Sequence, residues 1–117
     1  MTVNDFLNMY NETYPNSKIN KTRPRLVCKD GWNVSIQAGY GLYSIPCRRA
    51  WYYTNVELGY PSTAEELLRP YAENEEDLTG TVYASVPVEL VENVIMKHGG
   101  FDHCDFSNTK GENWNEY

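Results

Sequence analysis

The sequence lacks the segments and motifs that would assign it to most familiar functional classes. No apolar run approaches the ~18 residues that a membrane-spanning helix needs, and no apolar secretory segment precedes Asn4. There is no Cys-x-x-Cys pair, and Gly39-Tyr40-Gly41 lacks the remainder of either nucleotide-binding glycine fingerprint. No pair of acid–base groups is evident either. The sequence therefore predicts a non-enzymatic protein without a cofactor and without membrane contact.

Cysteine is scarce, and its number is odd. Cys28, Cys47 and Cys104 cannot all pair within one chain. Together with the missing secretory segment, this favours free thiols in a reducing, cytoplasmic environment.

Basic residues are few after the middle of the chain. Residues 1–58 hold seven Lys or Arg against four Asp or Glu, whereas residues 59–117 hold three against twelve. Affinity for nucleic acid comes from accumulated Lys and Arg contacts with phosphates, so direct nucleic-acid binding is not expected. A chain with separated charges is suited instead to steering toward a charged partner.

What the sequence does contain is enough apolar surface for one core. At 117 residues, 41% of them hydrophobic, it predicts a single domain without metal or disulfide support. Ten Tyr stand against three Phe. Tyrosine offers a large contact area with a polar tip, so this excess is compatible with a binding surface as well as with an ordinary small sheet.

Residues 23–46 predict a β-hairpin. Asp30-Gly31 is a strong two-residue turn signal, because a type I′ turn needs a positive φ at both central positions. This turn pairs Val27 with Val34 and leaves Leu26 and Cys28 on the outer face. The core face then carries Val27, Trp32, Val34, Ile36 and Ala38.

The remaining pattern alternates helices and strands. Helices are predicted over 2–10, over 63–69 behind a Ser62–Glu65 capping box, and over 88–98 after Pro87. Strands are predicted over 42–44, 52–60 and 80–86, the last with Val82, Ala84 and Val86 inward. The order indicates an α+β domain over 1–106, with a mostly antiparallel sheet of three to five strands and about three helices. Residues 107–117 are predicted to form a flexible polar tail, and an exposed strand edge is compatible with a homodimer.

Two catalytic or metal-binding interpretations carry little weight. His98, Asp102, His103, Cys104 and Asp105 are metal-ligand types, but their spacing matches no standard zinc pattern and His98 has a simple role at a helix end. Cys47 precedes two arginines that would lower a thiol pKa, yet no orienting third residue is recognisable. The sequence predicts neither a metal site nor a catalytic residue.

The segment CRRAW, residues 47–51, is the most concentrated chemical feature. Guanidinium groups match phosphates bidentately and aromatic faces stack on bases. Arg48, Arg49, Trp51 and Tyr53 are therefore candidate ligands for a signalling nucleotide, with Lys18, Lys21 or Arg23 added if the fold brings them near. The alternative is that Trp51 belongs to the core and the arginines pair with the acidic second half.

The acidic stretch Glu73, Glu75, Glu76 and Asp77 is the other candidate surface. Carboxylates spread over one face can fill a basic groove on a nucleic-acid enzyme, whereas the simpler reading is a solvated loop. These four residues are candidate partner-binding residues.

Three stretches, TRPRLVCKDGWNVSIQAGYGLYSIP, VELGYPSTAEEL and TVYASVPVELVENVIMKHGG, together resemble small accessory proteins of phages and prophages of Gram-positive bacteria. The resemblance covers most of residues 20–100 and transfers no site residue. It implies an anti-defence protein, anti-CRISPR-like, that binds and inhibits a host or defence protein in the host cytoplasm, with a nucleic-acid enzyme as one candidate partner. The alternative function is a protein that sequesters a signalling nucleotide through Arg48, Arg49 and Trp51.

Overall fold

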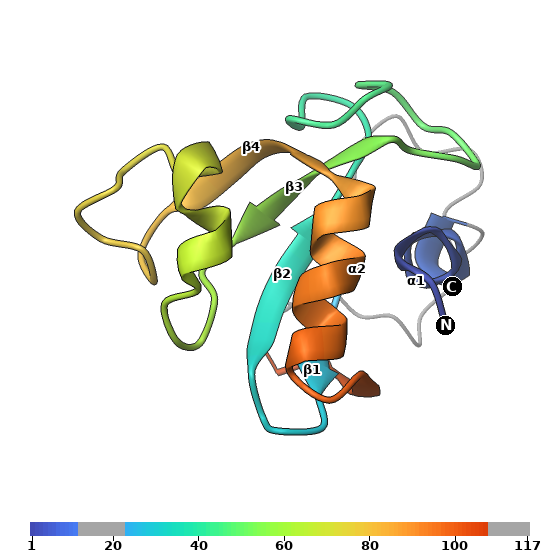
Figure 1. Cartoon of the computed structure of the whole chain (residues 1–117). Coiled ribbons are helices and arrows are strands. Elements are labelled where there is room, and N and C mark those ends of the chain that lie inside the picture. The colour runs from blue at the N-terminus through green and yellow to red at the C-terminus, as the bar shows by residue number, and fades with distance from the viewer. Residues whose placement is uncertain (12–22, 108–117) are drawn as a thin grey trace.

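The computed structural model describes residues 1–11 and 23–107, and the elements below are those of this part of the chain (Figure 1). In chain order they are helix α1 (Val3–Asn11), strands β1 (Arg25–Cys28), β2 (Asn33–Gln37) and β3 (Asn55–Gly59), the 3₁₀-helix η1 (Glu66–Tyr71), strand β4 (Val82–Pro87), helix α2 (Val88–Lys97) and strand β5 (Phe101–Asp105). The predicted loop with Lys18 and Lys21, and residues 108–117 of the predicted tail, lie outside the described residues.

The five strands form one sheet in the order β4-β3-β2-β1-β5, and each neighbouring pair is antiparallel. The predicted α+β class is confirmed: this is one small domain with a five-stranded antiparallel sheet and three helical segments. Among the described residues no helix is both long enough and apolar enough to cross a bilayer.

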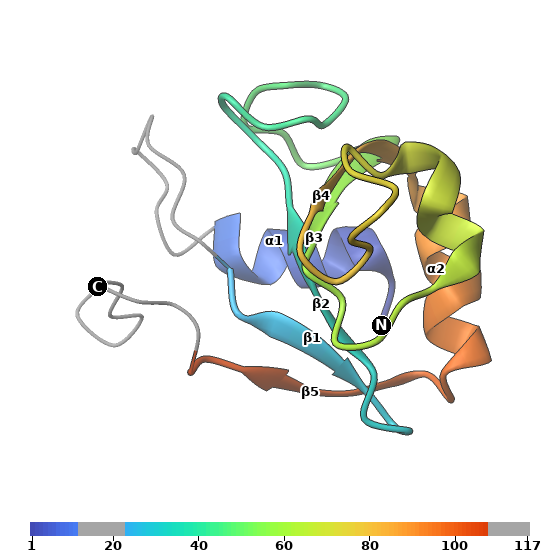
Figure 2. The same ribbon diagram turned by 90° about the vertical axis from the view of Figure 1, so that its left-hand side faces the viewer.

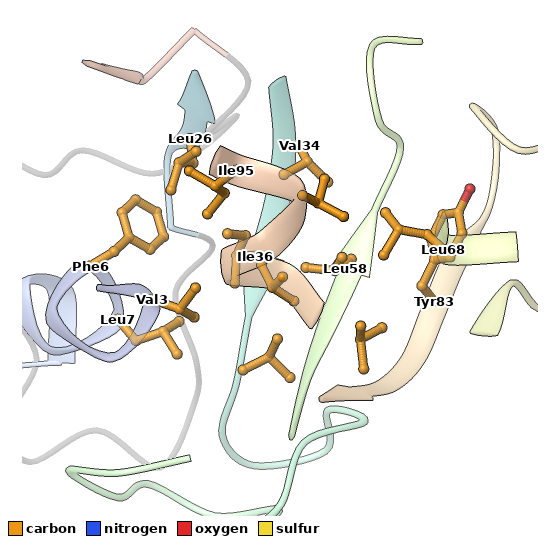
Figure 3. Packing of buried hydrophobic residues seen from close by; sticks show 14 of the residues in the cluster. Val3, Phe6, Leu7, Leu26, Val34, Ile36, Leu58, Leu68, Tyr83 and Ile95 are labelled. Atoms are coloured by element: carbon orange, nitrogen blue, oxygen red, sulfur yellow. The ribbon is translucent and has the colours of Figure 1, made fainter. Parts of the chain in front are cut away.

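The core lies between the sheet and the two α-helices. Helix α2 runs across one face of the sheet, as Figure 1 shows, and buries Val91, Val94 and Ile95 there. Helix α1 packs beside it, and the backbone amide of Val3 donates to the carboxylate of Glu92 on α2. Figure 3 shows the side chains that fill the space between these layers, among them Val3, Phe6, Leu7, Leu26, Val34, Ile36, Leu58 and Ile95.

The hairpin forms as predicted, but its register is one residue different. Val27 pairs with Asn33 and Leu26 with Val34, so the predicted pairing of Val27 with Val34 is wrong. The loop spans residues 29–31: the amide of Gly31 donates to the Cys28 carbonyl at 2.9 Å, and only Gly31, with φ +95°, adopts a positive φ. This is a type I turn followed by a glycine in the left-handed region.

The change of register exchanges the two faces of β1. Leu26 and Cys28 belong to the core cluster together with Trp32, Val34, Ile36 and Ala38, while Val27 does not. The prediction was therefore correct for β2 and inverted for β1, because a shift of one residue moves every side chain of a strand to the other face.

Strand β4 departs from simple alternation at a bulge. Val56 on β3 pairs with Val86 and Leu58 pairs with Tyr83, which leaves one extra residue on β4, and Ser85 has φ +50°. As a result Tyr83 and Val86 are both completely buried. Tyr83 was predicted to point outward; the bulge turns it into the core.

Two further predictions need correction, and a third is confirmed. Residues 42–44 form no strand; the adjacent Ile45 makes only an isolated bridge to Asn55. The predicted helix over 63–69 is the 3₁₀-helix η1, and Glu65 rather than Ser62 caps it, its carboxylate accepting from the amide of Leu67. The predicted helix over 88–98 is confirmed as α2, with Gly99 and Gly100 at positive φ after its end.

Strand β5 was not predicted. It pairs with β1 at one edge of the sheet, with Leu26 opposite Cys104 and Val27 opposite His103. The homodimer suggested by an exposed strand edge stays a prediction.

The positive φ of Gly31 provides a test of the hairpin. A Cβ at this position meets nothing within 4 Å, so a substitution acts on the backbone alone. Gly31→Ala is expected to lower the free energy of unfolding by about 1 kcal/mol, and Gly31→Asn by less, because asparagine tolerates the left-handed region better. Urea denaturation of the two variants measures this. An equal loss in both would contradict the assigned turn.

Candidate functional site

The candidate site is the long connection between β2 and β3, residues 39–54, here called the aromatic loop. It is tied down along its length by hydrogen bonds. The buried Ser44 hydroxyl accepts from the amide of Gly39 and donates to the carbonyl of Pro46. The Ile45 amide donates to the Asn55 carbonyl, and the Ile45 carbonyl accepts from the Thr54 amide. The aromatic loop is therefore an ordered surface loop with packed ends.

The β4 bulge supplies one of these ties. The amide of Ser85 donates to the Tyr43 carbonyl at 3.0 Å, and the amide of Tyr43 donates to a carboxylate oxygen of Glu57 at 3.2 Å. A backbone amide that the bulge removes from the ladder is thereby used to hold the aromatic loop against the sheet.

Tyr53 anchors the second half of the loop. Its ring is completely buried, and its hydroxyl donates to the Arg48 carbonyl and accepts from the Ala50 amide, both at 2.9 Å. Tyr53 was expected to contact a ligand directly; its burial gives it the different task of holding the backbone of residues 48–50. A buried hydroxyl needs such partners, since leaving it unpaired costs about 1–3 kcal/mol.

Helix α1 clamps the same segment through two asparagines. The Asn4 side chain accepts from the Tyr53 amide at 2.8 Å and donates to the Tyr53 carbonyl at 3.0 Å, and Asn8 donates to the Trp51 carbonyl at 2.8 Å. A role for these two asparagines was not predicted from the sequence. The signal was present, because Asn4 and Asn8 are four residues apart and share one face of a helix.

An open hollow of about 430 Å³ lies at this segment, lined by Arg48, Arg49, Ala50 and Trp51. Three of the four predicted ligand residues therefore meet at one place, and Tyr53 supports them from beneath. Trp51 is 62% exposed, so the alternative that it belongs to the core is wrong.

Arg23 places a buried guanidinium next to the start of the aromatic loop. Arg23 is 4% exposed, and its side chain donates to the carbonyls of Leu7 and Ala38. Burial lowers the pKa of Arg23 to about 10; Tyr53 opposes this shift and Arg49 adds to it.

Large exposed side chains gather on the aromatic loop. Each of them is about half exposed or more, and together they are Tyr40, Tyr43, Ile45, Trp51 and Tyr52. The loop contains two arginines and no acidic residue.

The predicted acidic residues occupy a separate exposed loop, residues 73–77, here called the acidic loop. Its backbone is ordered: the Glu73 amide donates to Val82, and the Asn74 side chain accepts from the Glu76 amide. The aromatic loop runs into the Asn55 end of β3, whereas the acidic loop runs toward the Val82 end of β4. Because Asn55 pairs with Pro87 and Gly59 with Val82, the two loops leave opposite ends of the β3–β4 pair (Figures 1 and 2).

A second polar cluster lies at the opposite end of the sheet from the aromatic loop and was not predicted. The His98 ring contacts Asp30 through Nδ1 at 2.6 Å and Glu65 through Nε2 at 2.8 Å, and it stacks on Trp32 at 4.6 Å between centroids. Glu65, 2% exposed, also accepts from Nζ of Lys97 at 2.9 Å. The cluster links the hairpin loop, the start of η1 and the end of α2. Its geometry therefore indicates a role in stabilising the fold.

The remaining metal-ligand and thiol candidates are dispersed. His103 contacts the neighbouring Asp102, and no group of three or more His, Cys, Asp or Glu side chains in residues 1–11 and 23–107 is arranged to hold a metal ion. The three cysteines are free thiols. Burial, and secondarily Asp30, raises the pKa of Cys28 to about 11, which makes this thiol unreactive.

Comparison of the chain with protein-family models, with curated proteins and with solved structures finds no match.

The His98 cluster predicts an acid-sensitive contribution to stability. Burial would raise the pKa of Glu65, but hydrogen bonds from Lys97, His98 and the Leu67 amide outweigh it and hold the pKa below its ordinary value of 4.5. The stabilisation is therefore present above the unfolded-state pKa and is lost as the pH falls through the folded-state pKa. Glu65→Gln is expected to lower the free energy of unfolding by about 2 kcal/mol at neutral pH.

The same substitution should flatten the pH dependence of unfolding in the acid range, measured by urea denaturation. Glu89→Gln, which removes an exposed acid from α2, is the control and should change neither quantity appreciably. An unchanged acid dependence in Glu65→Gln would show that the cluster adds no stability.

Proposed function

We propose that this chain is a non-enzymatic protein-binding module that inhibits its partner, and that the aromatic loop is the surface that binds. One observation carries the proposal: five large apolar or aromatic side chains are exposed together on a single ordered loop.

The composition of the loop favours contact with a protein. Tyrosine, tryptophan and arginine are enriched in the cores of protein interfaces and among the residues that carry most of the binding energy. Burial of apolar surface contributes roughly 25 cal/mol per Å², and the unbound protein lacks this contribution for side chains that are exposed to water. A partner that covers Tyr43, Trp51 and Tyr52 recovers this free energy.

The rigidity of the loop adds to the argument. Binding is weakened by the entropy lost when mobile loops and side chains become ordered. Here the backbone is already held by Ser44, Tyr53 and the two asparagines of α1. Little loop ordering is left to oppose association.

The acidic loop is assigned a supporting role. Exposed charges change association rates more than affinities, because they act at long range and are screened by salt. A partner with a basic patch is drawn in by Glu73, Glu75, Glu76 and Asp77. The aromatic loop, at the opposite end of the β3–β4 pair, holds the same partner through an apolar patch.

The biological setting we propose follows from the resemblance to phage and prophage accessory proteins. The partner is a host or defence protein in the host cytoplasm, and an enzyme that handles nucleic acid is favoured because such enzymes carry basic surfaces. The chain then acts as an anti-defence, anti-CRISPR-like inhibitor: the aromatic loop covers an apolar patch of that enzyme, and the acidic loop faces its basic surface. The proposal assigns it no reaction and no cofactor.

The first test removes two tyrosines that do not line the hollow. Tagged Tyr43→Ala/Tyr52→Ala protein should lose a partner that the unchanged protein captures near one-to-one from lysate of the host bacterium. Each side chain is expected to contribute more than about 1 kcal/mol, so the dissociation constant for the purified pair should rise by about tenfold or more.

Met96→Ala is the matched control, because Met96 is a large side chain exposed on α2. It should leave capture unchanged. A partner retained by the double tyrosine variant, or lost equally with Met96→Ala, would exclude the aromatic loop as the binding surface.

The second test neutralises the acidic loop by Glu73→Gln, Glu75→Gln, Glu76→Gln and Asp77→Asn. The association rate with the captured partner should fall several-fold and depend less on salt, while the dissociation rate changes little. Surface plasmon resonance at low and high salt measures both rates, with Glu89→Gln as the single-charge control. A faster dissociation with an unchanged association rate would mean that the acidic loop lies inside the interface.

A further inference from the structure

We infer that the hollow lined by Arg48, Arg49, Ala50 and Trp51 is a binding site for a nucleoside phosphate. The inference does not depend on a protein partner and concerns a ligand that the hollow takes by itself. It uses residues that differ from Tyr43 and Tyr52, so the two proposals can fail separately.

The size of the hollow fits such a ligand. Sites for small molecules are concave and have volumes of about 300–1,000 Å³. The hollow measures about 430 Å³ and is open on one side, which admits a ring system and one or two charged groups.

The chemistry of its wall has two parts that match the two parts of a nucleotide. Two guanidinium groups, from Arg48 and Arg49, provide forked donors suited to phosphate oxygens. The exposed indole of Trp51 provides an aromatic face, and stacking of a base on such a face contributes about 1–3 kcal/mol. A cation and an aromatic face in one hollow favour a planar, anionic ligand over a purely apolar one.

The surrounding charge strengthens the attraction for an anion. The chain carries a net charge of −6, yet the aromatic loop contains two arginines and no acidic residue. An anionic ligand in the hollow therefore meets cations and no carboxylate within this loop.

The wall is also held in place before any ligand arrives. The carbonyl of Arg48 and the amide of Ala50 are both bound by the buried Tyr53 hydroxyl, and the Trp51 carbonyl is bound by Asn8. The backbone that carries Arg48, Arg49 and Trp51 thus needs no rearrangement, and the binding free energy is not spent on ordering it.

The test measures binding of the four common nucleoside monophosphates and their 3′,5′-cyclic forms by isothermal titration calorimetry. Inorganic phosphate and the parent nucleosides are measured separately, because each represents one part of a nucleotide. At least one nucleotide is expected to bind, and more tightly than either of its halves. The two-dimensional NMR signal of the Trp51 indole N–H should shift on binding, while that of Trp32, whose indole donates to the Thr63 carbonyl, should not.

Variants then locate the site. Arg48→Glu with Arg49→Glu should abolish binding, and Trp51→Ala should weaken it by about tenfold or more. Lys29→Glu is the matched control for Arg48→Glu, because it makes the same change of charge in the β1–β2 loop at the opposite end of the sheet (Figure 1). If the double arginine variant does not fold, Arg48→Glu alone, whose side chain is exposed, gives the same comparison.

Three results would overturn the inference. The first is that no nucleotide binds at millimolar concentration. The second is that a nucleotide binds no more tightly than inorganic phosphate, which would reduce the hollow to a general anion site. The third is that binding persists in Arg48→Glu. A nucleotide that binds while Tyr43→Ala/Tyr52→Ala has no effect on partner capture would support this site and leave the protein-binding proposal refuted.

Discussion

One buried hydroxyl, which needs hydrogen-bond partners, determines the structure of the candidate site. Tyr53 brings a polar oxygen into the core at the point where α1, β3 and the aromatic loop meet, and no water reaches a side chain that is completely buried. The chain satisfies it with the carbonyl of Arg48 and the amide of Ala50. These two hydrogen bonds fix the backbone of residues 48–50 and thereby position two arginines and a tryptophan. The apolar core and the candidate binding surface are thus joined at a single side chain.

The β4 bulge plays the corresponding part for the first half of the loop. It gives up regular pairing at Ser85, and the released amide holds Tyr43, while the Ser85 carbonyl accepts from the Asn55 side chain. The irregular residue in the sheet is therefore the one that attaches the aromatic loop. Both anchors lie in β3 and β4 or next to them, so the geometry of the surface follows from the most extensively paired strands of the fold.

Local patterns predicted much of this architecture, and the failures have physical causes. Asp30-Gly31 located the hairpin, and the helical stripe with Val91, Val94 and Ile95 located α2. The turn type was wrong by one residue, because the same dipeptide serves two-residue and three-residue loops, and that single step inverted β1. Bulges and strand β5 leave weak signals, since FDHCD has no clear alternation. The His98 cluster joins residues 33 and 68 positions apart, and such contacts cannot be read from local spacing.

The hydrogen bonds described above hold the aromatic loop mainly through its backbone atoms. Their side-chain partners are either buried, as Ser44 and Tyr53 are, or belong to other elements. None of the bonds described above uses the side chains of Tyr43, Ile45, Trp51 or Tyr52. We therefore expect natural variants or libraries to exchange these four side chains at little cost in stability. The fold is in this respect a stable scaffold that carries an interchangeable candidate binding surface, in the way that the antibody sandwich carries its variable loops.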